Sequence, residues 1–113
     1  MTWVDNDLTK LAGGTPSDPA GGLGAAIDGY SQGDGSQHVY FIDAAGHVHE
    51  LYRSPDPAVQ WVDNDLTKLA GGTPAFNVIE GRSPLDGYSQ GDGSQHVNFI
   101  DAAGHVHELY RSP

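Results

Sequence analysis

This sequence of 113 residues lacks several features that would assign it a partner. It has no cysteine, which excludes a disulfide framework and a thiolate metal site. Only 5 lysine and arginine side chains stand against 15 carboxylates, and the net charge of −10 opposes binding to nucleic acid. No apolar run approaches the roughly 18 residues of a membrane-spanning helix, and the first residues do not resemble a signal peptide. Composition therefore predicts neither nucleic acid nor membrane as a partner, and it leaves the cellular location open.

The composition favours one small, folded, turn-rich domain. Glycine (16) and proline (7) are frequent, and 37% of the residues are hydrophobic, which predicts a modest core. Ten aromatic side chains (2 Trp, 5 Tyr and 3 Phe) argue for a folded chain over a disordered one.

Internal duplication dominates the sequence. Three blocks recur without change: residues 3–16 as 61–74, residues 28–39 as 86–97, and residues 41–55 as 99–113. The two copies differ only at Tyr40, which becomes Asn98, and between the segments 17–27 and 75–85. Old natural repeats drift throughout their length. Recent duplication or deliberate construction explains the confined differences better, and construction is the favoured explanation.

The chain divides into repeat 1 (residues 3–55), a linker (56–60) and repeat 2 (61–113), which we treat as one unit over 1–113. A period of 40–60 residues is typical of solenoids, propellers and arrays, whose units bury their faces against neighbours.

Each repeat is predicted to form four short antiparallel strands. Residues 37–43 and 47–53 alternate in polarity and flank a turn that ends on glycine, which indicates a hairpin. Residues 28–32 form an inner strand before an Asp-Gly turn, and residues 61–66 form the outer strand. No helical spacing is long enough to predict a helix. The predicted fold class is all-β: a β-propeller with two four-stranded antiparallel blades per chain.

The order of these strands leaves an open edge at each end. The chain starts with a copy of the outer strand, residues 3–8, and it ends on three strands, residues 86–111, that lack one. Two blades cannot close on themselves, because propellers have about four to eight blades. We expect a homo-oligomeric ring in which each chain lends its N-terminal strand to its neighbour. A homotrimer with six blades is favoured over a homotetramer with eight.

Residues 34–52, followed by residues 61–67, resemble the blades of lectin-like β-propellers. The most similar group is the tectonin and Psathyrella velutina lectin type, with bacterial relatives. The resemblance covers both repeats except the differing segments. It implies binding of small sugars such as fucose, N-acetylglucosamine or methylated sugars in shallow sites between blades, without catalysis. We therefore expect a binding protein, not an enzyme, and no cofactor.

Sugar binding uses aromatic faces for stacking and polar side chains for hydrogen bonds. The candidate ligand-binding residues supply both chemistries in each repeat: Trp3, Trp61, Tyr52, Tyr110, His49, His107, Glu50 and Glu108. The alternative is that these aromatic rings form the core between blades, which is the better interpretation for most of them. The corresponding alternative for function is a purely structural, designed scaffold without a specific ligand.

Three other patterns are weaker. His47 and His49 point to the same side of a strand, but Glu50 points to the opposite side, so polar packing is favoured and no metal site is assigned. Residues 5–7 start like a calcium loop but lack its later ligands. No serine has a base at the spacing of a catalytic triad.

If burial lowers the pKa of the histidines, acid should loosen the assembly.

Residues 79–82 match the recognition tetrapeptide of factor Xa-type proteases. They lie in a segment that differs between the repeats, so we expect the differing segments to be mobile and proteolysis to start at Arg82.

Overall fold

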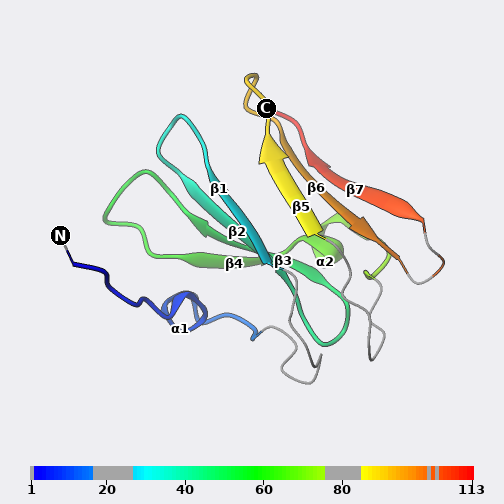
Figure 1. Ribbon diagram of the computed structural model, residues 1–113, viewed down its shortest axis with the longest axis horizontal. Helices are drawn as coiled ribbons and strands as arrows, with labels where there is room; N and C mark the ends of the chain where they lie inside the picture. The colour runs from blue at the N-terminus through cyan, green and yellow to red at the C-terminus, as the bar shows by residue number, and fades with distance from the viewer. Residues whose placement is uncertain (1, 17–26, 76–84, 102, 104) are drawn as a thin grey trace.

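The computed structural model describes residues 2–16, 27–75, 85–101, 103 and 105–113. These residues form two short helices and seven strands (Figure 1). In chain order they are α1 (Leu8–Ala12), β1 (Ile27–Ser31), β2 (Gln37–Ile42), β3 (Val48–Arg53), β4 (Val62–Asp65), α2 (Leu66–Ala70), β5 (Leu85–Ser89), β6 (Gln95–Ile100) and β7 (Val106–Arg111). Among the described residues, no helix has the length and apolar character needed to cross a membrane.

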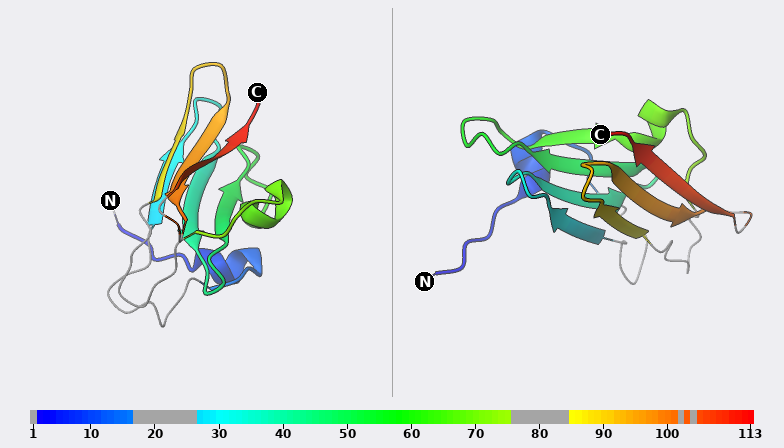
Figure 2. Two further views of the ribbon diagram at one scale, coloured as in Figure 1. Left: turned by 90° about the vertical axis from the view of Figure 1, so that its right-hand side faces the viewer. Right: turned by 90° about the horizontal axis from the view of Figure 1, so that it is seen from above.

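The strands form two antiparallel sheets, one of four strands in the order β1-β2-β3-β4 and one of three in the order β5-β6-β7. The structure is thus mostly β, as predicted, and the hairpin predicted for each repeat is confirmed as β2–β3 and β6–β7. The sheets lie side by side with β1 in contact with β5 (Figures 1 and 2). Their registers agree, since Ile42 pairs with Val48 in one and Ile100 with Val106 in the other.

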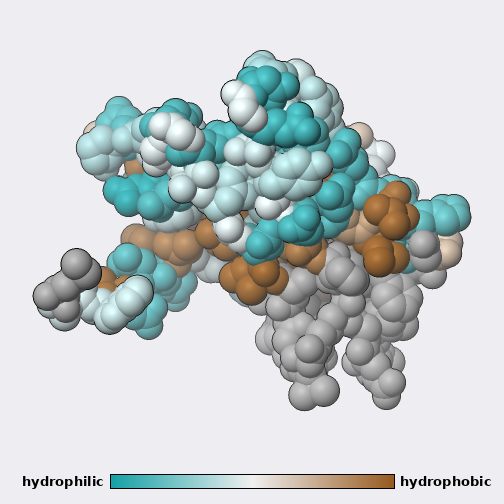
Figure 3. Space-filling view, turned by 45° about the horizontal axis from the view of Figure 1, so that its top comes forward, coloured by the Kyte–Doolittle hydropathy of each residue, from teal (hydrophilic) through white to brown (hydrophobic). Residues whose placement is uncertain are grey.

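The turns form where glycine was expected to permit them. Gly46 closes the β2–β3 turn with a φ of 83°, and its N–H donates to the carbonyl of Asp43 over 3.0 Å. Gly35 has a φ of 91° in the β1–β2 turn. This left-handed region costs glycine little because it has no Cβ. Figure 3 shows that the end of the molecule carrying the β1–β2 and β5–β6 turns is largely hydrophilic.

The outer strand of repeat 1 differs from the prediction. It was expected over residues 61–66, but β4 ends at Asp65 and the chain continues as α2. The carboxylate of Asp65 accepts a hydrogen bond from the backbone N–H of Lys68, and Gly71 ends the helix with a φ of 61°. The prediction of no helix was wrong, because these caps stabilise a single turn too short to show apolar periodicity.

The second sheet has no fourth strand among the described residues, and residues 3–7 are in no sheet. The N-terminal segment lies beyond β4, on the side of the molecule opposite β7 (Figures 1 and 2). One chain therefore does not complete its own second sheet.

Ile27 and Leu85 begin β1 and β5, and Ala75 is buried. The rest of the two differing segments, with Arg82, lies outside the described residues.

The core lies where the two sheets meet. Its buried side chains are Tyr40, Ile42, Val48, Ala75, Val97 and Phe99. Tyr40 packs so closely on β5 that a Cβ added to Gly87 would lie 2.6 Å from its Cε2 atom. The N–H of Gly87 also donates to the carboxylate of Asp28 over 2.6 Å. The aromatic residue that distinguishes repeat 1 thus joins the two sheets.

Candidate functional site

The outer edge of the second sheet is open where that of the first is covered. Val48 in β3 is 0% exposed beneath β4 and α2, whereas its counterpart Val106 in β7 is 75% exposed. The side chain of Glu50 is 7% exposed and that of Glu108 is 46% exposed. These residues are identical in type and register, but Val48 and Glu50 have both the covering segment and the second sheet against them, whereas Val106 and Glu108 have neither among the described residues.

The segment that covers β3 makes specific polar contacts. The hydroxyl of Thr67, in α2, accepts a hydrogen bond from the buried N–H of Val48 over 2.8 Å. The Nδ1 atom of His47 lies 2.7 Å from Oδ2 of Asp65, at the end of β4. These contacts belong to β4 and α2, whose sequence recurs in the N-terminal segment.

The N-terminal segment has the same local structure as the segment that covers β3. Helix α1 begins after Asp7 and ends before Gly13, whose φ and ψ of 61° and 34° equal those of Gly71 after α2. Trp3 and Val4 are 99% and 74% exposed. The N-terminal segment is therefore a second copy of the covering segment. Its helix has already formed, and the residues before the helix are exposed.

Beneath the strands of each sheet lies a buried polar chain. Nε2 of His38 lies 3.0 Å from the Ser36 hydroxyl, and its Nδ1 lies 2.9 Å from Oε2 of Glu50. The hydroxyl of Tyr40 donates to the same oxygen over 3.0 Å, and the hydroxyl of Tyr30 lies 2.8 Å from the Tyr40 hydroxyl. Sheet two repeats the Ser94–His96–Glu108 part. No buried side-chain polar atom among the described residues lacks a partner.

These contacts set the charge of the buried groups. Burial alone would raise the pKa of Glu50, but hydrogen bonding and charge attraction from His38 outweigh it and lower that pKa. Burial raises the pKa of Tyr40, and its contacts with Tyr30 and Glu50 add to the rise. The network therefore holds a carboxylate and a neutral phenol in contact.

A second polar cluster surrounds His49. Its Nδ1 lies 2.7 Å from Oδ1 of Asp63, and its Nε2 lies 2.7 Å from Oδ2 of Asp43 and 3.9 Å from Oδ2 of Asp65. Burial alone would lower the pKa of His49, but the hydrogen bonds to Asp63 and Asp43 outweigh it and raise that pKa. The expectation that acid loosens the assembly required burial to lower the pKa values of the histidines, and the pKa of His49 is raised instead. Its contribution to stability is present below about pH 6.5 and is lost as pH rises through the folded-state pKa.

The carboxylates of this cluster were not predicted from the sequence. Asp43 lies in a turn, and Asp63 and Asp65 lie on β4, which reaches β3 only through the long 54–61 connection. One signal was present in the sequence: His47 and His49 are two residues apart, as are Asp63 and Asp65. To pair these residues from the sequence, the register of β3 against β4 would have had to be known.

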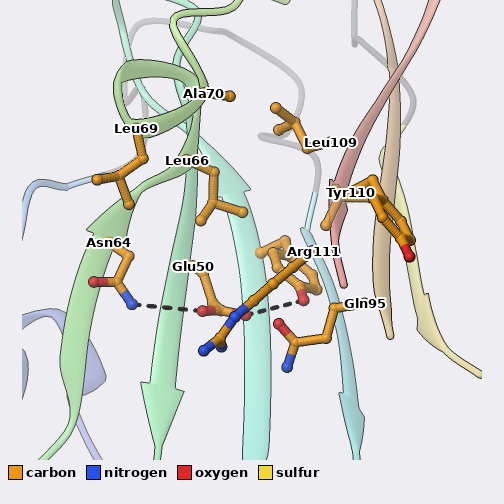
Figure 4. A pocket seen from close by; sticks show the side chains of 11 residues that line it. Glu50, Asn64, Leu66, Leu69, Ala70, Gln95, Leu109, Tyr110 and Arg111 are labelled. Carbon is orange, nitrogen blue, oxygen red and sulfur yellow. Dashed lines mark hydrogen bonds between the residues drawn. The ribbon is translucent and has the colours of Figure 1, made fainter. Parts of the chain in front are cut away.

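A half-open cavity of about 390 Å³ lies between the two sheets and α2 (Figure 4). Leu66, Leu69 and Leu109 line one end of it in the figure. The polar side chains of the lining lie toward the other end: Glu50, Asn64, Gln95 and Arg111. Arg111 extends toward Glu50, which also accepts a hydrogen bond from Tyr40.

The cavity brings together only part of the predicted site. Glu50 and Tyr110 line it. The ring of Tyr52 instead lies 5.2 Å from that of His38, and Trp61 is half-buried just before β4. The remaining predicted residues lie elsewhere: His49 and His107 against aspartates, Glu108 on the open sheet, and Trp3 in the exposed N-terminal segment.

Comparison of the chain with protein-family models, with curated proteins and with solved structures gives no match. The resemblance to lectin-like propellers stays a prediction from the residue pattern.

Proposed function

We propose that this chain is a self-assembling β-propeller subunit whose N-terminal segment adds the missing fourth strand to β7 of another copy. One observation carries the proposal: the exposed residues 3–7 have the same sequence as the segment that leads into and forms β4, while the edge that needs such a strand is bare in β7. The occupant is thus a second copy of this chain.

The energetics favour the exchange. The register of β4 on β3 pairs Asp63 with Leu51 and Val62 with Tyr52. The same register would place Asp5 opposite Leu109 of the next copy. Val48 is buried by the second sheet as well as by the covering segment. Burying Val106 in the same way, beneath the first sheet and the N-terminal segment of the next copy, would contribute about 1.5–3 kcal/mol, besides the backbone hydrogen bonds of the new strand. An uncovered edge is otherwise a template for aggregation.

The contact is head-to-tail, so it closes into a ring or grows into a fibre. With two blades per chain, three chains give six blades and four give eight, both within the usual range for propellers. We favour the trimer.

The mass of the assembly in solution tests this proposal. Light scattering at micromolar concentration should give three or four times 11.9 kDa. Deleting residues 1–8 should abolish the ring. The double substitution Val4→Pro with Asp5→Pro should also abolish the ring, because proline has no backbone N–H to donate. The N–H groups of successive strand residues alternate in direction, so one of the two must face the partner strand. Lys10→Ala, on the exposed face of α1, is the control and should leave the mass unchanged. A wild-type mass of 11.9 kDa would refute the assembly.

We propose carbohydrate binding as a second function, in the cavity between the sheets. The observation that favours it is that the Tyr40 ring and the polar side chains of Glu50, Asn64 and Arg111 line one preformed cavity. Sugars bind through such a combination of an aromatic face and fixed polar groups.

A glycan array tests this second function. Binding should be lost in Arg111→Ala and retained in Lys68→Ala, which removes a cation outside the cavity lining. If no sugar binds above background, the alternative of a structural scaffold without a ligand replaces it.

A further inference from the structure

The side chains around His49 converge on one point. Nε2 of His49, Oδ2 of Asp43 and Oδ2 of Asp65 all lie within 4.8 Å of one another. Nδ1 of His47 lies 2.7 Å from that same Asp65 oxygen. The three ligand atoms come from the β2–β3 turn, from β3 and from the end of β4. One imidazole and two carboxylates therefore face a common centre, of which His49 and Asp43 are buried.

Each member is held by contacts that leave one donor atom for the centre. Asp63 binds the Nδ1 atom of His49, and this leaves the Nε2 atom of His49 for the centre. Oδ1 of Asp43 accepts hydrogen bonds from the backbone N–H groups of Ala45 and His47, and this leaves Oδ2 of Asp43 for the centre. A carboxylate behind a histidine is the arrangement that orients metal-binding imidazoles and increases their basicity.

The spacing and chemistry suit zinc. Tetrahedral Zn²⁺ with bonds of about 2.0–2.1 Å needs ligand atoms about 3.3 Å apart. The separations of 2.7 Å and 3.9 Å from His49 to Asp43 and Asp65 bracket that value. Imidazole nitrogen with carboxylate oxygen is a donor set that zinc accepts. We propose that Asp43, His49 and Asp65 form a Zn²⁺ site that ties β4 to β3, with the fourth position left to a water or another ligand.

The second sheet contains the counterparts of two of the three ligands, His107 and Asp101. Nε2 of His107 lies 2.6 Å from Oδ2 of Asp101, and Nδ1 of His105 lies 3.9 Å from it. The aspartates equivalent to Asp63 and Asp65 are Asp5 and Asp7, in the N-terminal segment. This second site rests on the proposed strand exchange, and it needs Asp7 of another copy. Zinc would then hold the exchanged strand in place across each contact between copies.

Zinc titration after treatment with a chelator tests both sites. Isothermal titration of the wild-type chain with Zn²⁺ should give two zinc ions per chain. Asp65→Asn should remove the site within the chain, and Asp7→Asn should remove the site between copies. The two variants are matched, because each aspartate caps the helix of the same repeated segment, and asparagine caps as well as aspartate. Asp63→Asn should weaken zinc binding on the order of 10–100-fold without removing a ligand.

The mass of each protein in chelator separates the outcomes. If the wild-type chain binds no zinc, both sites are refuted, whatever its mass. If it assembles and binds a single zinc that Asp65→Asn removes and Asp7→Asn does not, the shared site is refuted and the site on β3 and β4 is supported. If its mass is 11.9 kDa and it binds one zinc, the strand exchange fails while the first site is again supported. Equal urea midpoints of the variants and wild type in chelator would show that the variants fold.

Discussion

Replacing Thr67 by valine tests how the covering segment holds β3. Valine matches threonine in size but cannot accept the hydrogen bond from the N–H of Val48. Thr67 is 2% exposed and Val48 is 0% exposed, so no water can replace the hydroxyl without a rearrangement. An unpaired buried N–H costs about 1–3 kcal/mol. This is a substantial part of the roughly 5–15 kcal/mol that stabilises a small domain.

The assay is urea unfolding followed by circular dichroism. With a slope of about 2 kcal/mol per molar urea, a loss of about 2 kcal/mol would lower the midpoint by about 1 M. The slope itself should not change, because the surface exposed on unfolding is the same. An unchanged midpoint for Thr67→Val would refute this account of the covered edge.

Thr9→Val is the matched variant, because residues 3–16 repeat residues 61–74. Among the described residues the Thr9 hydroxyl makes no hydrogen bond. At concentrations below assembly, Thr9→Val should leave the midpoint unchanged. At concentrations where copies associate, it should weaken association about tenfold for each 1.4 kcal/mol lost. A shift of the midpoint at low concentration would contradict the strand-exchange geometry.

Two further predictions concern the contact between the sheets. Gly87→Ala should destabilise the protein more than Gly29→Ala in thermal unfolding. A Cβ at Gly87 meets the Tyr40 ring at 2.6 Å, whereas the atom nearest to one at Gly29 is the His38 carbonyl oxygen at 3.2 Å. Equal losses would argue against a tight junction. The raised pKa of Tyr40 implies that stability falls above about pH 10, by up to about 1.4 kcal/mol per pH unit, because the unfolded chain releases that proton first. Tyr40→Asn, which introduces the repeat-2 residue, should flatten this dependence, and an unchanged slope in urea titrations between pH 9 and 11 would contradict it.

The strands were predictable because their signals are local. Residues 37–53 carry their own alternation and a turn that needs a glycine with positive φ, and repeat 2 repeats both. The end of β4 was misplaced because two capping contacts, at Asp65 and Gly71, decide where the strand gives way to α2. Such contacts stabilise a single turn without any apolar pattern.

The candidate site was less predictable because it depends on contacts between distant segments. The partners of His47 and His49 on β4 lie 18 and 14 residues away along the chain. Their meeting depends on the register of one strand pair, which alternation alone does not fix. Glu50 and Tyr110 both line one cavity, but they come from two sheets whose relative placement no local pattern encodes.

The single exchange of Tyr40 for Asn98 makes the joints of the proposed ring unequal. Within a chain, the Tyr40 ring fills the space beside Gly87. Between chains, the smaller Asn98 would face Gly29, so less apolar surface is buried there. The ring should therefore part between copies before it parts within one, and subunits should exchange through that joint. Asn98→Tyr should slow the exchange, which mixing of two differently labelled populations would measure.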